Sequence, residues 1–264
     1  MISRRTPQNI LAYLLKEKNT KVVFLGHQKS GTTAISALFS EYVGLSYSSD
    51  PIFKSSPSTS LTLDSFLNNE DEFNVFLNNN KKLFYKNSVK DPDFILNFPL
   101  TERIYPYAHF VFISRDPHQI IRSIFNRLKL DGNSKKDTVS KDEIYMPTEN
   151  WLYMLNGKHP KQDGLSIISR LAERIEASTK YYLENKDKIH HVSYEDFKRE
   201  KLKSIENLAL RLGFEKKKDI TSHLEKNFQP PGNNNIEIKD FFGQENYDDI
   251  AKICKNSLRI CKLE

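Results

Sequence analysis

Cysteine is scarce in this chain, with two among 264 residues. Cys254 and Cys261 stand seven positions apart, which suits one face of a helix but is too far for a disulfide within it. There is no Cys-x-x-Cys pair and no Cys/His cluster, the usual signs of structural zinc. We therefore expect buried free thiols in a reducing compartment, and no metal.

Long apolar runs are also missing. No stretch approaches the ~18 apolar residues that a membrane-spanning helix needs, so we expect no membrane span. Arg4 and Arg5 precede the apolar segment 10–15, but Lys16 and Lys18 follow it and no small-residue cleavage site appears. This segment predicts a first helix rather than a signal peptide, and we expect a cytoplasmic protein.

Charge of one sign is only slightly in excess: 40 Lys and Arg against 34 Asp and Glu give a net charge of +6. The densest basic run, Lys216–Lys218, is too short to indicate a nucleic-acid partner. The excess fits either a solvated surface or a pocket for an anionic ligand. No internal repeat and no break in composition divides the chain, so we expect a single domain over residues 1–264.

Short β-branched and aromatic runs alternate with segments of helical periodicity. The runs predict strands at 22–25, 83–89, 110–113 and 189–192. The periodic segments predict helices at 34–42, 61–77, 92–103, 117–128, 165–183, 202–212 and 247–258. We expect loops at 46–60, at 131–142 and after Pro230. Strands alternating with helices predict an α/β fold, a parallel sheet flanked by helices.

The segment Gly26–Thr33, Gly-His-Gln-Lys-Ser-Gly-Thr-Thr, lies between a predicted strand and a predicted helix. Backbone N–H groups at a helix start attract an anion, and Gly31 permits the tight turn. Lys29 adds a charge, and Ser30, Thr32 and Thr33 add hydroxyl donors. We therefore predict an anion-binding loop here.

A nucleotide-hydrolysing P-loop has a lysine directly after its second glycine, where this chain has Thr32. The nearest lysine, Lys29, is inside the loop instead. Asp116, which follows the strand 110–113 and precedes Pro117, is placed to cap a helix rather than to hold magnesium. These departures disfavour magnesium-dependent phosphoryl transfer.

Three motifs together resemble the sulfotransferases that use 3′-phosphoadenosine 5′-phosphosulfate (PAPS), over roughly residues 20–215. Lys-Ser-Gly-Thr-Thr resembles the family's 5′-phosphosulfate loop. Arg115, with Ser123 eight residues later, resembles the pair that binds the 3′-phosphate. His-Val-Ser-Tyr-Glu-Asp resembles the turn whose tyrosine, here Tyr194, lies against the adenine. The resemblance implies a P-loop-like sulfotransferase core in which Lys29 stabilises the leaving phosphate.

Lys90-Asp91-Pro92 resembles a motif of the tyrosylprotein branch, which implies that Lys90 stabilises the transferring sulfuryl group. The general base is less clear. Cytosolic members have a histidine where this chain has Pro92, and the tyrosylprotein branch has a carboxylate whose place corresponds to Asp50. We therefore expect Asp50 to be the base, and the equal alternative is that Asp50 only caps a turn before Pro51. Asp91 and His27 are the other candidates for the base.

We expect sulfuryl transfer from PAPS to a hydroxyl or amine of a small molecule, glycan or peptide, without a metal. A P-loop small-molecule kinase and a nucleotide-binding module without turnover remain open. The segments 46–60, 131–150 and 228–245 are expected to select the acceptor. Trp151, Tyr153 and Met154 are more typical of a helix face in the core than of the acceptor site. The Arg-Lys-Gly that cytosolic members have near the C-terminus is absent, and Lys239 is the candidate substitute.

Overall fold

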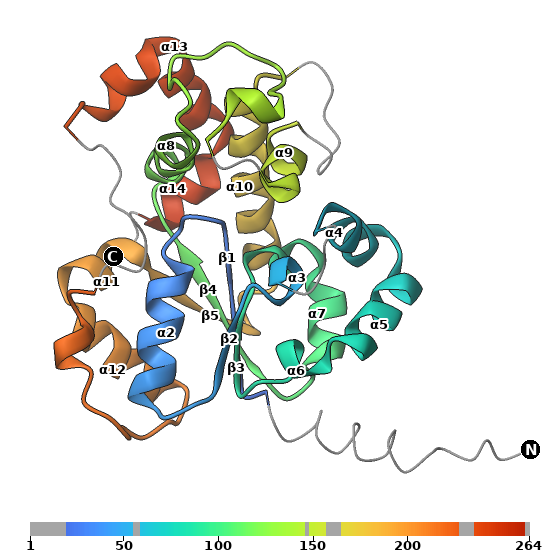
Figure 1. The fold of residues 1–264 in the computed structure, drawn as a ribbon. Helices are drawn as coiled ribbons and strands as arrows, with labels where there is room; N and C mark the ends of the chain where they lie inside the picture. Colours follow the sequence, from blue (N-terminus) through green and yellow to red (C-terminus); the bar gives the residue numbers. More distant parts are fainter. Residues whose placement is uncertain (1–19, 55–58, 146–147, 157–164, 227–234, 262–264) are drawn as a thin grey trace, which may run out of the picture.

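Five parallel strands form one sheet in the order β2-β3-β1-β4-β5 (Figure 1). The computed structural model describes residues 20–54, 59–145, 148–156, 165–226 and 235–261, and the sheet lies within them. Its strands are β1 (Val22–Gly26), β2 (Tyr47–Ser49), β3 (Ser88–Lys90), β4 (His109–Ser114) and β5 (Ile189–Ser193). The predicted parallel sheet is confirmed. The expected helix at 10–15 lies outside the described residues.

β1 is the central strand and is buried along its whole length. Val23 and Leu25 join an apolar cluster on one face of the sheet, whereas Val22 and Phe24 join a cluster on the other. Both faces are covered, so every position of the strand is apolar, as its continuous run predicted.

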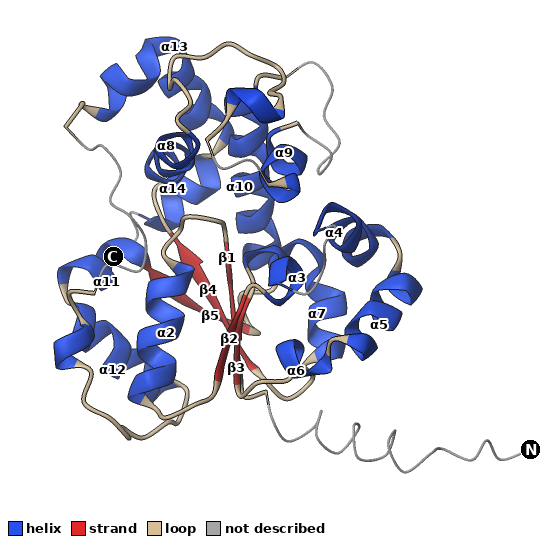
Figure 2. Cartoon of the chain, in the orientation of Figure 1, coloured by secondary structure: helices blue, strands red, loops and turns tan. Residues whose placement is uncertain are grey.

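Helices cover both faces of the sheet and the carboxyl ends of its strands (Figure 2). One face packs against α2 (Thr32–Tyr42), α11 (Tyr194–Arg199) and α12 (Lys201–Arg211). The other packs against α3 (Pro51–Lys54), α4 (Thr59–Asn68), α5 (Glu70–Asn79), α6 (Lys81–Phe84), the 3-10 helix η1 (Pro92–Asn97) and α7 (Phe98–Ile104). Beyond the carboxyl ends, a third apolar cluster joins α8 (Pro117–Leu128), α9 (Glu149–Leu155), α10 (Ile167–Glu184) and α13 (Ile238–Ile253). α14 (Lys255–Cys261) packs on α10, and η2 (Lys141–Glu143) and η3 (Thr221–His223) are short 3-10 turns.

The segment 46–60 is not the loop that its Ser and Pro content predicted, because it contains β2 and α3. β2 is an edge strand of three residues that pairs with β3. Because the strand is so short, the sequence contains no apolar run that would have predicted it. The expected strand at 83–89 is also corrected: only Ser88–Lys90 is extended. Phe84 belongs to α6 instead, where its side chain is buried in the core.

The expected helix at 61–77 is divided into α4 and α5. Asn69 stands between them and caps α5, since its side chain accepts a hydrogen bond from the backbone N–H of Glu72 at 3.3 Å. The expected loop at 131–142 is confirmed up to the first turn of η2. The remaining predicted helices and strands up to residue 212 match the structure to within a few residues.

The C-terminal helix begins earlier than expected, at Ile238, so residues 238–242 of the expected loop 228–245 are helical. The helix kinks at Gly243, whose φ of 69° and ψ of 162° are non-helical. Cys254 follows the end of α13 and is buried, whereas Cys261 is half-buried, and both are free thiols. Burial raises the pKa of Cys261 to about 12, which makes its thiol unreactive.

Candidate functional site

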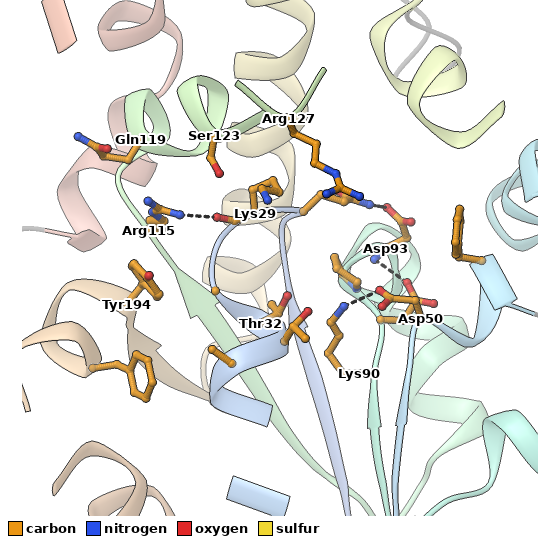
Figure 3. A pocket seen from close by; sticks show the side chains of 18 of the residues that line it. Lys29, Thr32, Asp50, Lys90, Asp93, Arg115, Gln119, Ser123, Arg127 and Tyr194 are labelled. Atoms are coloured by element: carbon orange, nitrogen blue, oxygen red, sulfur yellow. Dashed lines mark hydrogen bonds and ion pairs between the residues drawn. The ribbon is translucent and has the colours of Figure 1, made fainter. Parts of the chain in front are cut away.

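A cleft of about 760 Å³ opens at the carboxyl ends of the strands, where open α/β sheets bind ligands. It collects residues that are far apart in the sequence, from Gln28 after β1 to Lys226 after η3 (Figure 3). Seven cationic side chains line it, against three carboxylates. The cations are Lys29, Lys90, Arg115, Arg122, Arg127, Lys201 and Lys226, and the carboxylates are Asp50, Asp91 and Asp93.

The loop at residues 26–33, called the Lys29 loop below, connects β1 to α2. Gly31 has a φ of 94°, and a Cβ there would lie 2.1 Å from the ring of Tyr194. Thr32 and Thr33 line the cleft in the first turn of α2. The hydroxyl of Ser30 is buried and donates to the carbonyl of His27 at 2.8 Å, so this side chain stabilises the loop itself rather than lining the cleft.

Lys29 adopts a left-handed backbone conformation, with a φ of 71°. Its carbonyl accepts a hydrogen bond from Nη1 of Arg115 at 2.8 Å. Burial, followed by the charges of Arg127 and Arg115, lowers the pKa of its ammonium from 10.5 to about 8. The protein therefore holds this cation at an energetic cost, which an anionic ligand would relieve.

Lys90 is the last residue of β3, and its buried ammonium lies 2.5 Å from a carboxylate oxygen of Asp50. The backbone N–H of Asp50 also donates to the carbonyl of Lys90 at 2.7 Å, which fixes the two residues together. The side chain of Asp50 is 33% exposed, against 4% for Lys90. Asp50 thus presents a carboxylate to the cleft from the loop after β2.

The other two candidate bases, Asp91 and His27, are buried and lie close to backbone hydrogen-bonding groups. The carboxylate of Asp91 accepts hydrogen bonds from the backbone N–H groups of Ile52 and Asp93, both at 3.2 Å, and it caps η1. His27 does not line the cleft; its Nδ1 lies 2.9 Å from the carbonyl of Gln28. Burial and the charge of Arg174 lower the pKa of His27 to about 4. Asp50 is the most accessible of the three.

Arg115 directly follows β4, and α8 brings Ser123 to the cleft about two turns later. Asp116 caps this helix, as predicted, by accepting from the backbone N–H of Gln119 at 3.1 Å, and Pro117 occupies the first turn. Arg127 was missed by the sequence analysis, although it lies four residues after Ser123 on the same face and lines the cleft. Its spacing was the available signal.

Tyr194 lies beside Arg115, whose guanidinium carbon is 4.5 Å from the centre of the tyrosine ring. Phe197 and Leu224 continue this wall of the cleft. The ring of Tyr194 also covers Gly31, which explains why that position excludes a side chain. In Figure 3, Tyr194 and Arg115 lie on one side of the Lys29 loop, and Lys90 and Asp50 lie on the other.

Other residues that the sequence singled out have varied positions. Trp151 lines the cleft, whereas Tyr153 and Met154 are buried in the core. Lys239 is not among the residues that line it; Lys201 and Lys226 are. His191, on β5, lies with Nε2 2.7 Å from the hydroxyl of Ser114.

The described residues contain no group of three or more His, Cys, Asp or Glu side chains placed to hold a metal ion. Within the same residues, no helix has the length and apolar character needed to cross a membrane.

The sequence model of the sulfotransferase family matches residues 56–218, more than half of the chain. The match contains Lys90, Arg115, Ser123 and Tyr194 and begins after Asp50. Among solved structures, a sulfotransferase from Alicyclobacillus acidocaldarius is similar, with 14% identity and a TM-score of 0.48 over 89% of this chain and 96% of that one. None of the curated proteins matches the chain. On the strength of the family match, the chain belongs to the sulfotransferase family and is an enzyme of that family.

Proposed function

We propose that the enzyme transfers a sulfuryl group from PAPS to a hydroxyl or amine acceptor. The observation that carries this proposal is the excess of cations in the cleft, where Lys29, Lys90 and Arg115 are gathered from three strand ends. A donor that carries a sulfate, a bridging phosphate and a 3′-phosphate matches that charge. The cleft volume of about 760 Å³ is also in the range of small-molecule sites.

The donor would lie along the Lys29 loop. The N–H groups at the start of α2, with the hydroxyls of Thr32 and Thr33, bind its 5′-phosphosulfate. Arg115, Ser123 and Arg127 bind the 3′-phosphate from β4 and α8. Tyr194 lies against the adenine. The hydroxyl and the backbone N–H of Ser30 both donate to the carbonyl of His27, at 2.8 and 3.1 Å, so the expected contact of Ser30 with the donor is replaced by a role in shaping the loop.

In the transfer step, an acceptor oxygen or nitrogen attacks sulfur as the bond from sulfur to the 5′-phosphate oxygen breaks. Lys29 stabilises the charge that develops on that oxygen, and Lys90 stabilises the sulfuryl oxygens. Asp50 takes the proton that the acceptor loses. The leaving group is adenosine 3′,5′-bisphosphate. These cations do the work that a magnesium ion does in phosphoryl transfer, so the proposal includes no metal.

The ion pair of Lys90 with Asp50 gives the two residues linked roles. While the donor is absent, Lys90 is neutralised by Asp50 at 2.5 Å. A sulfuryl group within reach of Lys90 competes for its ammonium and releases an oxygen of Asp50 toward the acceptor. The exposure of Asp50 supports its role as the base over buried Asp91 and His27.

The kinase alternative has less support. Thr32 occupies the place of the P-loop lysine, and the carboxylate of Asp116 is engaged as the cap of α8. A module without turnover would keep the nucleotide site and would not need the pair of Lys90 and Asp50. Because the cleft contains both the Lys29 loop and the pair of Lys90 and Asp50, it favours an enzyme over a binding module.

Thermal unfolding with adenosine 3′,5′-bisphosphate and with ADP at equal concentration tests the donor. At a hundredfold excess over its Kd, the bisphosphate should raise stability by about 2.7 kcal/mol over the ligand-free protein. ADP should raise it less, because only the bisphosphate engages Arg115 and Ser123. The variant Ser123→Ala should reduce this preference and leave ADP unaffected. Equal stabilisation of the wild type by both nucleotides would refute the 3′-phosphate assignment.

Transfer itself is tested with 35S-labelled PAPS and a panel of phenols, alcohols, amines, sugars and peptides. Sulfated product should form equally well with EDTA. Activity that needs ATP and is restored by magnesium after chelation would favour the kinase. Tight bisphosphate binding without transfer to any acceptor would favour a module without turnover.

A further inference from the structure

A polar bridge of mostly buried side chains joins the Lys29 loop to two neighbouring elements, and two of its members, Gln28 and Asp93, also line the cleft. Asp93, on η1, accepts a hydrogen bond from Nη2 of Arg174 at 2.6 Å and another from the side-chain amide of Gln28 at 2.7 Å, both on Oδ1. Arg174 comes from α10 and is 2% exposed, and Asp93 is 4% exposed. Gln28 immediately precedes Lys29. The bridge therefore connects α10, η1 and the loop.

The same bridge reaches Lys90. The backbone N–H of Asp93 is capped by Asp91, the residue that follows Lys90, so η1 is fixed to the end of β3. One carboxylate, that of Asp93, is thus tied both to the residue before Lys29 and to the turn after Lys90. Arg115 holds the loop from the opposite side, through the carbonyl of Lys29.

The conformation of Lys29 explains why such support is needed. A left-handed φ costs a residue with a Cβ on the order of 1 kcal/mol, and it persists only where neighbouring contacts impose it. Without the anchor on Gln28, the backbone of Lys29 can relax and its ammonium can leave the cleft.

The buried ion pair of Arg174 and Asp93 is weak evidence for a stabilising role. Two charges buried together are often no more stabilising than apolar side chains of similar volume. An apolar pair in place of Arg174 and Asp93, however, could not accept the amide proton of Gln28.

We infer that Arg174, Asp93 and Gln28 are positioning residues, which hold the Lys29 ammonium at a fixed place relative to Lys90. This inference rests on the proposed function, in which both lysines act on the sulfuryl group and its leaving phosphate. None of the three residues needs to touch the reacting atoms.

A double-mutant cycle on adenosine 3′,5′-bisphosphate binding tests the inference. Gln28→Leu removes the amide donor and keeps most of the volume. It should weaken binding about tenfold in the wild type and less than about twofold in a Lys29→Met background, because it acts through Lys29. A merely structural effect would weaken binding equally in both backgrounds.

A second variant tests the buried pair. Arg174→Met with Asp93→Leu should keep the melting temperature and still weaken bisphosphate binding in the Lys29-dependent way. The matched control is Arg170→Met on the same helix, which removes another buried guanidinium, one that donates to the carbonyl of Leu155 at 3.4 Å. This control should keep wild-type affinity.

The outcomes distinguish a failure of the positioning role from a failure of the proposed function. Equal effects of Gln28→Leu in both backgrounds, wild-type affinity of Gln28→Leu, or an equal loss in Arg170→Met would overturn the positioning role alone. A wild type that does not bind the bisphosphate would overturn the proposed function together with this inference. If the apolar pair does not fold, the Gln28 cycle decides.

Discussion

The lowered pKa of Lys29 makes ligand binding depend on pH in a way that can be calculated. Its ammonium has a pKa of about 8 in the free protein, against an ordinary value of 10.5. A bound 5′-phosphate would return the pKa at least to the ordinary value, because the phosphate favours the charged form. Below pH 8 the free protein already has the cation. Above pH 8 it must take up a proton in order to bind.

The size of the effect follows from these two values. Affinity for adenosine 3′,5′-bisphosphate should fall about tenfold between pH 7 and pH 9 as Lys29 of the ligand-free protein loses its proton. At pH 8 about half of the free molecules lack the charge, so binding should take up about 0.5 proton per site. The pKa of the phosphates, near 6, is too low to contribute over this range.

Isothermal titration in two buffers of different ionisation enthalpy measures both quantities, because the difference in observed heat gives the protons taken up. Lys29→Arg is the matched control: arginine stays charged throughout, so both the proton uptake and the pH dependence should disappear. Affinity that is constant from pH 7 to pH 9 in the wild type would refute the assignment of Lys29 to the phosphate site. The same slope in Lys29→Arg would assign the titration to another group.

Three further outcomes are expected. Gly31→Ala should abolish bisphosphate binding, since the new Cβ would lie 2.1 Å from the ring of Tyr194; the control Gly213→Ala, at a φ of 72° with no atom within 4 Å, should retain binding despite a similar backbone strain. Asp50→Asn should keep bisphosphate affinity and lower turnover ~10²–10⁴-fold once an acceptor is known, whereas wild-type turnover would assign the base elsewhere. Lys29→Met should raise the stability of the ligand-free protein at pH 7 by about 1–3 kcal/mol in urea unfolding, because it removes a charge that burial disfavours. If the Lys29→Met protein were less stable than the wild type, the charge of Lys29 would not be destabilising in the ligand-free protein.

The grouping of the Lys29 loop with Arg115 and Ser123 in one cleft could be predicted from the sequence because its signals are local. A strand, a glycine turn and a helix in succession indicated the Lys29 loop. Arg115 directly follows β4 and Ser123 lies two turns later in α8, so their spacing predicted that both would reach one site. Arg127 continues that face by four residues and was within reach of the same reasoning.

The polar bridge at the Lys29 loop could not be predicted in that way. Asp93 meets Gln28 across 65 positions and Arg174 across 81 positions of sequence, and no local pattern encodes either contact. The same holds for β2, whose three residues are extended because β3 pairs with them. The conformation of these segments depends on tertiary contacts, whereas the conformation of α2 and α8 follows from local sequence preferences.

The order of strands has a consequence for how the enzyme is made. The first strand along the chain, β1, lies at the centre of the sheet. Its residue Val22 pairs with Ser88 and His109, which are synthesised 66 and 87 residues later. The wall at Tyr194 is translated later still. A ribosome-bound chain therefore exposes the apolar strand β1 before any partner can cover it, at a stage when the cleft does not exist. A ligand of the cleft can stabilise only finished molecules. On the proposed function, we therefore expect added bisphosphate to protect a destabilised variant from unfolding after synthesis and to leave its yield during translation unchanged.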